Sequence, residues 1–260
     1  MDNRHQNFKI KTAYNSIHMC YHNGRLELRS HDKALQCVIN LENRHRLELK
    51  NLKYLVSVLL FIPVPRRILI LGTAAGSLVH FLRHHYPQAD VTAVDIDTEL
   101  IERLLEMGIL PAGGAGLDYV YADAAEYIAR CKQSYDLVLF DVFTGVQSPN
   151  WLLAKKKVIK QLHKLVTKQG ALACNLIIDS DHDFNLFYGN FRRIFDQRSL
   201  SLPVAELENR IIHGVRAVNA ETDMSENLQK ALALSDKFGF DLMPILSVIY
   251  NTNPVGKGLI

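Results

Sequence analysis

The chain has little cysteine, no marked excess of charge and no long hydrophobic run. Its four cysteines, Cys20, Cys37, Cys131 and Cys174, are scattered through 260 residues. Without paired spacing they indicate neither a disulfide framework nor a metal site. The 30 basic and 27 acidic residues leave a net charge of +3, which is too small to indicate a nucleic-acid partner.

The longest apolar run, residues 55–65, is too short to span a bilayer and contains Ser57 and two prolines. The first residues lack the apolar core that a signal peptide needs. We therefore expect a cytoplasmic protein that binds no metal, no membrane and no nucleic acid.

The first 45 residues predict a small β domain. Residues 17–21 and 25–29 alternate in polarity and flank Asn23-Gly24, a sequence typical of tight hairpin turns. A third strand is expected at 36–41, and residues 47–61 have the apolar spacing of a helix. We expect two domains, residues 1–45 and residues 46–260.

From Arg67 onward, short apolar runs alternate with helical patterns. Strands are predicted at 68–71, 91–94, 119–121, 137–140 and 171–178, and helices at 77–86, 98–107, 124–131 and 152–168. This alternation predicts an α/β fold with a parallel sheet covered on both faces. Further along we expect a helix around Phe187, a hairpin of residues 200–207 and 210–217 about Glu208-Asn209, a helix at 224–237 and a weakly patterned tail.

A turn of small residues, Gly72-Thr-Ala-Ala-Gly76, follows the first of these strands, and Asp95 ends the second. Asp95 comes 23 residues after Gly72. That spacing is typical of a strand–turn–helix unit that binds a nucleoside, in which the acid accepts hydrogen bonds from ribose hydroxyls. Ala74 replaces the middle glycine of the dinucleotide fingerprint, so a single nucleoside fits better than NAD. A turn that serves packing alone is the other interpretation.

Polar side chains also stand at the ends of three other predicted strands. Asp123 follows the third strand, Asp141 ends the fourth, and Asn175 lies in the fifth. Because the carboxyl ends of parallel strands meet at one edge of a sheet, we expect these groups and Asp95 to share a site. Asp123 also suits a helix N-cap, and Asp141 either orients and deprotonates a nucleophile or caps a turn.

Four segments resemble, in order and spacing, the spermidine synthase family. They are Gly72 to Gly76, Asp95-Ile-Asp97, Tyr121-Ala-Asp123-Ala124, and Tyr135 to Phe143. The resemblance implies a Rossmann-like sheet of the class I S-adenosylmethionine-dependent methyltransferases. It also implies a small N-terminal β domain and a nucleoside-binding catalytic domain, to which the predicted hairpin of residues 200–217 adds a C-terminal antiparallel hairpin.

The resemblance also assigns roles to residues. It implies that Asp95 holds ribose hydroxyls, that Asp123 reads the adenine amino group, and that Asp141 is the catalytic group that faces the reacting amine. The expected cofactor-binding residues are Gly72, Ala74, Gly76, Asp95, Asp123 and Ala124. Candidates for contact with the acceptor substrate are Gln36, Phe143, Thr144, Asn175, Asp179 and Asp181.

Two departures from the family bear on the reaction. The family has aspartates where this chain has Ala75 and Thr144; one contacts the aminopropyl ammonium of decarboxylated S-adenosylmethionine, and the other helps to seat the polyamine. Burying ammonium groups without carboxylates is costly. We therefore favour methyl transfer from S-adenosylmethionine to an unknown small-molecule acceptor, such as an amine.

Two alternatives stay open at this point. One is a polyamine aminopropyltransferase that uses decarboxylated S-adenosylmethionine, and the other is a non-catalytic nucleoside-binding protein. The segment 179–183 either supplies the missing acids or caps the helix that follows it. A homodimer is expected from the resemblance alone.

Overall fold

Two β-sheets organise the chain in the computed structural model, which describes residues 7–30, 35–145, 147–153, 156–216, 224–253 and 259–260. The strands are β1 (Asn7–Lys11), β2 (Ser16–His22), β3 (Arg25–Arg29), β4 (Leu35–Asn40), β5 (Arg67–Leu71), β6 (Asp90–Asp95), β7 (Leu117–Tyr121), β8 (Tyr135–Phe140), β9 (Val166–Leu176), β10 (Ser199–Pro203) and β11 (Arg210–Val215). The helices are α1 (Lys50–Val56), the 3-10 helix η1 (Ser57–Phe61), α2 (Ser77–His85), α3 (Thr98–Glu106), α4 (Ala124–Arg130), α5 (Asn150–Leu153), α6 (Lys156–Leu165), α7 (Asp181–Ile194), α8 (Met224–Phe238) and α9 (Met243–Thr252).

The larger sheet has seven strands in the order β10-β11-β9-β8-β5-β6-β7. Strands β9, β8, β5, β6 and β7 are parallel, whereas β11 runs antiparallel to both β9 and β10. This is the expected α/β fold, with a Rossmann-like sheet and an antiparallel hairpin at its far edge.

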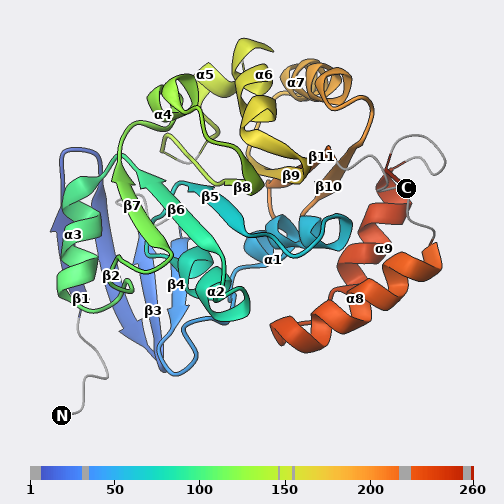
Figure 1. The fold of residues 1–260 in the computed structure, drawn as a ribbon. Coiled ribbons are helices and arrows are strands. Elements are labelled where there is room, and N and C mark those ends of the chain that lie inside the picture. Colours follow the sequence, from blue (N-terminus) through green and yellow to red (C-terminus); the bar gives the residue numbers. More distant parts are fainter. Residues whose placement is uncertain (1–6, 31–34, 146, 154–155, 217–223, 254–258) are drawn as a thin grey trace.

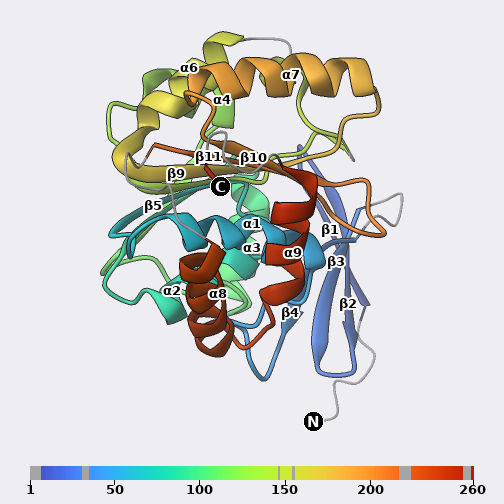
Figure 2. The ribbon, with the colours of Figure 1, turned by 90° about the vertical axis from the view of Figure 1, so that its right-hand side faces the viewer.

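Helices cover both faces of this sheet because alternate strand residues are apolar on each side. Ile68 and Ile70 of β5 point to the face packed by α1, η1, α2, α8 and α9. Leu69 and Leu71 point to the opposite face, where α4, α6 and α7 pack. Figure 2 shows these two layers, with α6 and α7 on one side of the sheet and α1 and α8 on the other.

The smaller sheet is an antiparallel meander of β1, β2, β3 and β4. Its inner face packs on α3 and on the turn before α2, through buried side chains such as Met19, Leu26 and Leu104. Ser77, at the start of α2, donates a hydrogen bond to the Val38 carbonyl oxygen (3.2 Å). In Figure 1 this sheet and α3 lie next to each other at the left of the view, beside β7.

Polar contacts join the two sheets near the strand ends. The buried Asp97 caps α3 by accepting a hydrogen bond from the Leu100 amide. Its other oxygen accepts hydrogen bonds from the Thr12 hydroxyl (2.7 Å) and the Asn15 side-chain amide (2.6 Å) of the β1–β2 turn. The turn is therefore fixed beside the carboxyl end of β6.

Four expectations about individual elements were wrong. The expected helix at 152–168 is two helices, and strand β9 begins at Val166, where the Thr167 hydroxyl donates to Asp136 of β8. Strand β10 ends at Pro203, so a turn longer than Glu208-Asn209 joins it to β11. The weakly patterned tail contains α9, which has Pro244 in its first turn. Strand β1 was not expected, because it is short and largely exposed, and only Ile10 is partly buried against the core. Among the described residues, we find no helix with the length and hydrophobicity needed to cross a membrane.

Candidate nucleoside and amine site

The candidate site lies where the chain changes direction along the sheet. From β5 the chain proceeds outward through β6 and β7, and it then returns to β8 on the other side of β5. Such a switch point opens a crevice beyond the carboxyl ends of the two central strands. The Gly72 turn and Asp141 stand at these two ends, where the Asp141 amide donates to the Leu71 carbonyl oxygen (2.8 Å).

Gly72 brings the turn very close to the backbone after β8. Its φ of +89° is left-handed, and a Cβ atom at this position would lie 2.3 Å from the Asp141 carbonyl oxygen. Only glycine satisfies both conditions. Ala74 also has a positive φ (+45°), and it lines the site while Ala75 points away from it.

A cavity of about 500 Å³ opens over these strand ends. The described residues that line it are Tyr14, Asn15, Leu35, Gln36, Leu49, Asn51, Leu52, Gly72, Ala74, Val94, Asp95, Ile96, Leu100, Ala122, Asp123, Ala124, Asp141, Val142, Phe143, Thr144, Gly145, Trp151, Ile177 and Asn209. Its charged side chains are the three aspartates, and no lysine, arginine or histidine occurs among these lining residues.

Asp95, at the end of β6, already has three backbone donors. One carboxylate oxygen accepts hydrogen bonds from the amides of Thr73 (2.8 Å) and Ala74 (3.2 Å), and the other accepts from the Asp97 amide (2.9 Å). A carboxylate has about four acceptor positions, so one is left for a ligand hydroxyl. Asp95 therefore shapes the turn and still presents an acceptor to the cavity.

Asp123 combines both roles that its position suggested. One of its oxygens accepts a hydrogen bond from the Glu126 amide (3.0 Å) and so caps α4. The residue also lines the cavity, together with its neighbours Ala122 and Ala124. Its second oxygen makes no hydrogen bond that the structure records, so it can accept one from a ligand.

Asp141 is held from behind by two asparagines. The buried Asn175 of β9 donates to one Asp141 oxygen (2.8 Å), and the side chain of Asn209, which precedes β11, donates to the side-chain oxygen Oδ1 of Asn175 (2.9 Å). Burial raises the pKa of Asp141 to about 6, while the hydrogen bond from Asn175 acts in the opposite direction. The carboxyl group therefore titrates close to neutral pH, which suits a group that exchanges a proton with an amine.

The rest of the cavity has neutral walls. Of the expected acceptor contacts, Gln36, Phe143 and Thr144 line it, whereas Asn175 lies behind Asp141. Trp151 also lines it, with its ring edge-to-face against Phe140 at 5.9 Å. Sequence reasoning missed the contributions of the β1–β2 turn and the start of α1, which are Tyr14, Asn15, Leu49, Asn51 and Leu52. These segments have no motif, and only the packing of the two sheets brings them to the site.

The remaining site expectations lie outside the cavity lining. Asp179 accepts a hydrogen bond from Gln147, and the exposed Asp181 pairs with Arg210 (3.3 Å). Gly76 is the left-handed N-cap of α2 and packs against Leu110. Ala75 is fully buried in the apolar contact between the turn and the smaller sheet. The position that carries an acid in the resembling family is thus an apolar packing position here.

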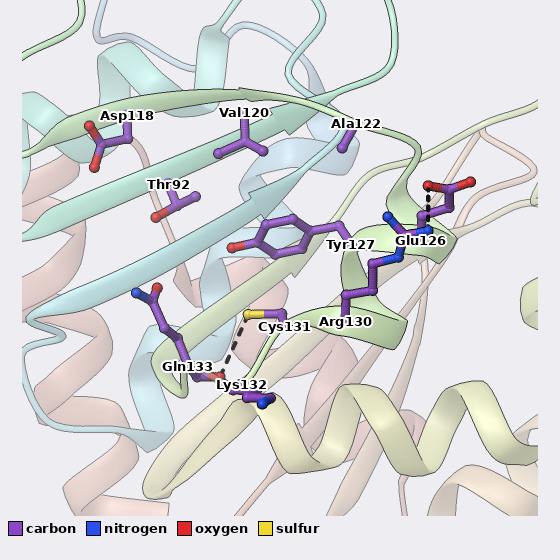
Figure 3. A pocket seen from close by; sticks show the side chains of 10 residues that line it. All are labelled: Thr92, Asp118, Val120, Ala122, Glu126, Tyr127, Arg130, Cys131, Lys132 and Gln133. Atoms are coloured by element: carbon purple, nitrogen blue, oxygen red, sulfur yellow. Dashed lines mark hydrogen bonds and ion pairs between the residues drawn. The ribbon is translucent and has the colours of Figure 1, made fainter.

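A second hollow, of about 560 Å³, lies beside the edge strand β7 (Figure 3). Figure 3 shows Asp118, Val120 and Ala122 following one another along this strand, with the Tyr127 side chain of α4 across from them. Its polar groups largely satisfy one another, because the Tyr127 hydroxyl bonds that of Tyr135 (2.6 Å) and Arg130 pairs with Glu126 (3.7 Å). Since Asp95 and Asp141 do not line this hollow, we place the candidate site in the other cavity.

Comparisons with known proteins show which family the chain resembles. The profile of the spermine/spermidine synthase domain matches residues 54–176, a segment that contains the turn and all three aspartates. A polyamine aminopropyltransferase from Neisseria meningitidis serogroup A is 25% identical over 222 residues, which cover 85% of this chain and 84% of that protein. The chain is spermidine synthase-like.

Solved structures of low sequence identity show the same fold. A probable spermidine synthase from Corynebacterium glutamicum superposes with a TM-score of 0.73 at 18% identity, covering 89% of this chain and 86% of that one. Human methyltransferase-like protein 13 in complex with SAH has a TM-score of 0.62 at 21% identity, covering 76% of this chain and 95% of that one. The spermidine synthase-like chain therefore has the Rossmann-like class I methyltransferase sheet that its motifs implied.

Proposed function

We propose that this spermidine synthase-like chain is an aminopropyltransferase that transfers the aminopropyl group of decarboxylated S-adenosylmethionine to an amine. The similarity to a polyamine aminopropyltransferase along most of the chain supports this choice. It reverses the preference for methyl transfer that the sequence alone suggested.

The charge of the cavity is the observation that carries the proposal. The described lining residues provide three carboxylates and no cationic side chain. S-adenosylmethionine has a carboxylate that would find no cationic partner here and would lie among like charges, which is unfavourable. The decarboxylated donor has only positive charges, on its sulfonium and its ammonium, so it fits an acidic cavity better.

The chain's own residues have three tasks in this reaction. Asp95 and Asp123 have unused acceptor positions for the ribose and adenine, and the Gly72 turn allows close approach of the donor. The sulfonium donor supplies a carbon that is already activated, so catalysis consists of positioning and proton removal. Asp141 holds the attacking amine and accepts its proton.

Methyl transfer remains the second candidate because Ala75 and Thr144 stand where the resembling family has acids. Such a methyltransferase would need to hold the carboxylate of S-adenosylmethionine with neutral hydrogen-bond donors, because the described lining has no cationic side chain. A non-catalytic nucleoside-binding protein would bind a donor without turnover. The three hypotheses therefore differ in which donor binds and in whether methylthioadenosine is released.

Calorimetric titration with both donors tests the proposal. We expect decarboxylated S-adenosylmethionine to bind at least ten times more tightly than S-adenosylmethionine, and to release methylthioadenosine when an amine is present. Equal or tighter binding of S-adenosylmethionine would contradict the proposal. Binding without release of methylthioadenosine for any amine would favour the non-catalytic alternative.

A pair of variants tests where the donor binds. Asp95→Asn should weaken donor binding by roughly 1.5–3 kcal/mol, because a charge-assisted hydrogen bond to the ribose is lost. Asp118→Asn removes an acid from the second hollow and should leave binding unchanged. The opposite pattern would place the donor in the second hollow.

A further inference from the structure

The walls of the cavity around Asp141 differ from what a polycation would require. Apolar side chains line much of these walls. They come from β4, the start of α1, the segment after β8, α5 and the end of β9, and they are Leu35, Leu49, Leu52, Val142, Phe143, Trp151 and Ile177. The polar groups on this side are neutral: Gln36, Asn51, Thr144 and Asn209. Asp141 is the single carboxylate on this side of the described lining.

Other acids near the rim are already engaged and do not line the cavity. Asp179 is bonded by Gln147, and Asp181 is paired with Arg210. Asp95 and Asp123 belong to the nucleoside side, at the ends of β6 and β7. A second ammonium group on the acceptor would therefore be removed from water against apolar side chains and neutral amides.

The free energy needed to remove an ammonium group from water determines which acceptors can bind. An ammonium that loses water without gaining a carboxylate is unfavourable by several kcal/mol, even after local relaxation. An alkyl or aryl group in the same place gains from burial against Leu52, Phe143 and Trp151. The same cavity thus favours an apolar body and disfavours a second charge.

We propose that the acceptor is a primary monoamine with an apolar body, whose single ammonium pairs with Asp141 while the body packs against the apolar walls. This inference rests on the proposed aminopropyl transfer and specifies its substrate class. In the reaction, a proton passes from the acceptor ammonium to Asp141, and the freed nitrogen lone pair forms the new N–C bond. The C–S bond breaks, and its electron pair stays on sulfur, which leaves as neutral methylthioadenosine.

Two probes of matched size test the inference with the decarboxylated donor. Pentan-1-amine and 1,4-diaminobutane have the same number of non-hydrogen atoms, and a terminal methyl group in one replaces the second amine of the other. We measure methylthioadenosine release with each at pH 8. The expected kcat/KM for pentan-1-amine is at least tenfold higher than for 1,4-diaminobutane.

A variant that adds a negative charge to the cavity tests the same inference from the side of the protein. Thr144→Asp adds a carboxylate to the neutral wall and should reverse the preference in favour of 1,4-diaminobutane by at least tenfold. The control is Thr252→Asp, at an exposed threonine of α9 outside the cavity lining, which should keep the wild-type preference.

The outcomes distinguish failure of the monoamine inference from failure of the proposed aminopropyl transfer. Turnover with 1,4-diaminobutane as fast as or faster than with pentan-1-amine would overturn the monoamine inference and leave aminopropyl transfer standing. Methylthioadenosine release with neither amine, nor with longer or aromatic amines, would overturn both.

Discussion

Two opposing effects determine the pKa of Asp141. Burial raises its pKa to about 6, and the hydrogen bond from Asn175 favours its charged form. Asn209 in turn fixes the orientation of the Asn175 amide. In the proposed reaction the two asparagines are therefore positioning residues: Asn175 favours the carboxylate of Asp141, and Asn209 acts through Asn175.

The dependence of kcat/KM on pH tests this arrangement of Asp141 and the two asparagines. Because only the carboxylate pairs with an amine and accepts its proton, kcat/KM should fall below a bend near pH 6. Asn175→Ala removes the hydrogen bond that favours the carboxylate, so the bend should move to higher pH, with activity lost progressively at pH 6–7. The measurement is kcat/KM between pH 5 and 9, and Asp141→Asn should abolish activity throughout.

A matched control is Asn251→Ala, at an exposed asparagine of α9, which should leave the bend in place. If Asn175→Ala lowers activity equally at every pH, Asn175 serves packing alone. A bend that stays near pH 6 in this variant would also show that another group titrates there.

At the scale of elements, the sequence predicted the strands and helices that have a local pattern. The runs at 68–71, 91–94 and 137–140 are strands because their residues are buried on both faces of a parallel sheet, and continuous apolar runs are typical of that environment. Helix α9 was missed because most of its residues are apolar and its polar side chains, Ser247, Asn251 and Thr252, give only a weak helical pattern.

The turn between β5 and α2 is the element whose geometry is most tightly determined. Gly72→Ala should destabilise the fold and abolish donor binding, because its Cβ atom would lie 2.3 Å from the Asp141 carbonyl oxygen. Either the turn or the backbone that carries Asp141 must then move. Chemical denaturation and titration with the decarboxylated donor measure the two effects.

Gly24→Ala is the matched control. Gly24 has a comparable φ of +72°, but a Cβ atom there would meet nothing within 4 Å. Gly24→Ala should therefore lower the free energy of unfolding by only about 1–2 kcal/mol, which is the cost of an alanine in the left-handed conformation, and should leave donor binding unchanged. If the two variants lose the same stability and both bind donor, the close contact at Gly72 has no role in the site.

At the scale of the whole molecule, the sequence predicted the cavity lining at the ends of β6 and β7 better than the lining around Asp141. Asp95 and Asp123 line the cavity, as expected from their fixed places in local strand–helix units, and their contacts with a nucleoside stay predictions. Leu49, Asn51 and Leu52 could not be found, since only the packing of the first helix against the larger sheet brings them to the cavity. The proposed domain boundary after residue 45 and the expected homodimer stay predictions.

The same packing buries a histidine, which makes the stability of the whole fold depend on pH. His213 of β11 is fully buried and hydrogen-bonds the Tyr54 carbonyl oxygen of α1 through Nε2 (3.2 Å), while its Nδ1 atom has no hydrogen-bond partner among the described residues. Burial lowers the pKa of His213 to about 3, below the value of 6.5 for an unperturbed histidine. A folded-state pKa below the unfolded one means that acid favours unfolding.

The stability that depends on neutral His213 is therefore fully present above pH 6.5 and is lost as the pH falls toward 3. The expected loss is about 1.4 kcal/mol per pH unit, or about 2 kcal/mol at pH 5. His213→Gln cannot titrate, so its free energy of unfolding should be lower at pH 8 but should fall less steeply between pH 7 and 5. Urea denaturation between pH 5 and 7 measures how steeply the free energy of unfolding depends on pH. The control is His18→Gln, at an exposed histidine, which should keep the wild-type slope. Equal slopes in the wild type and both variants would mean that His213 is not the group that makes the fold acid-sensitive.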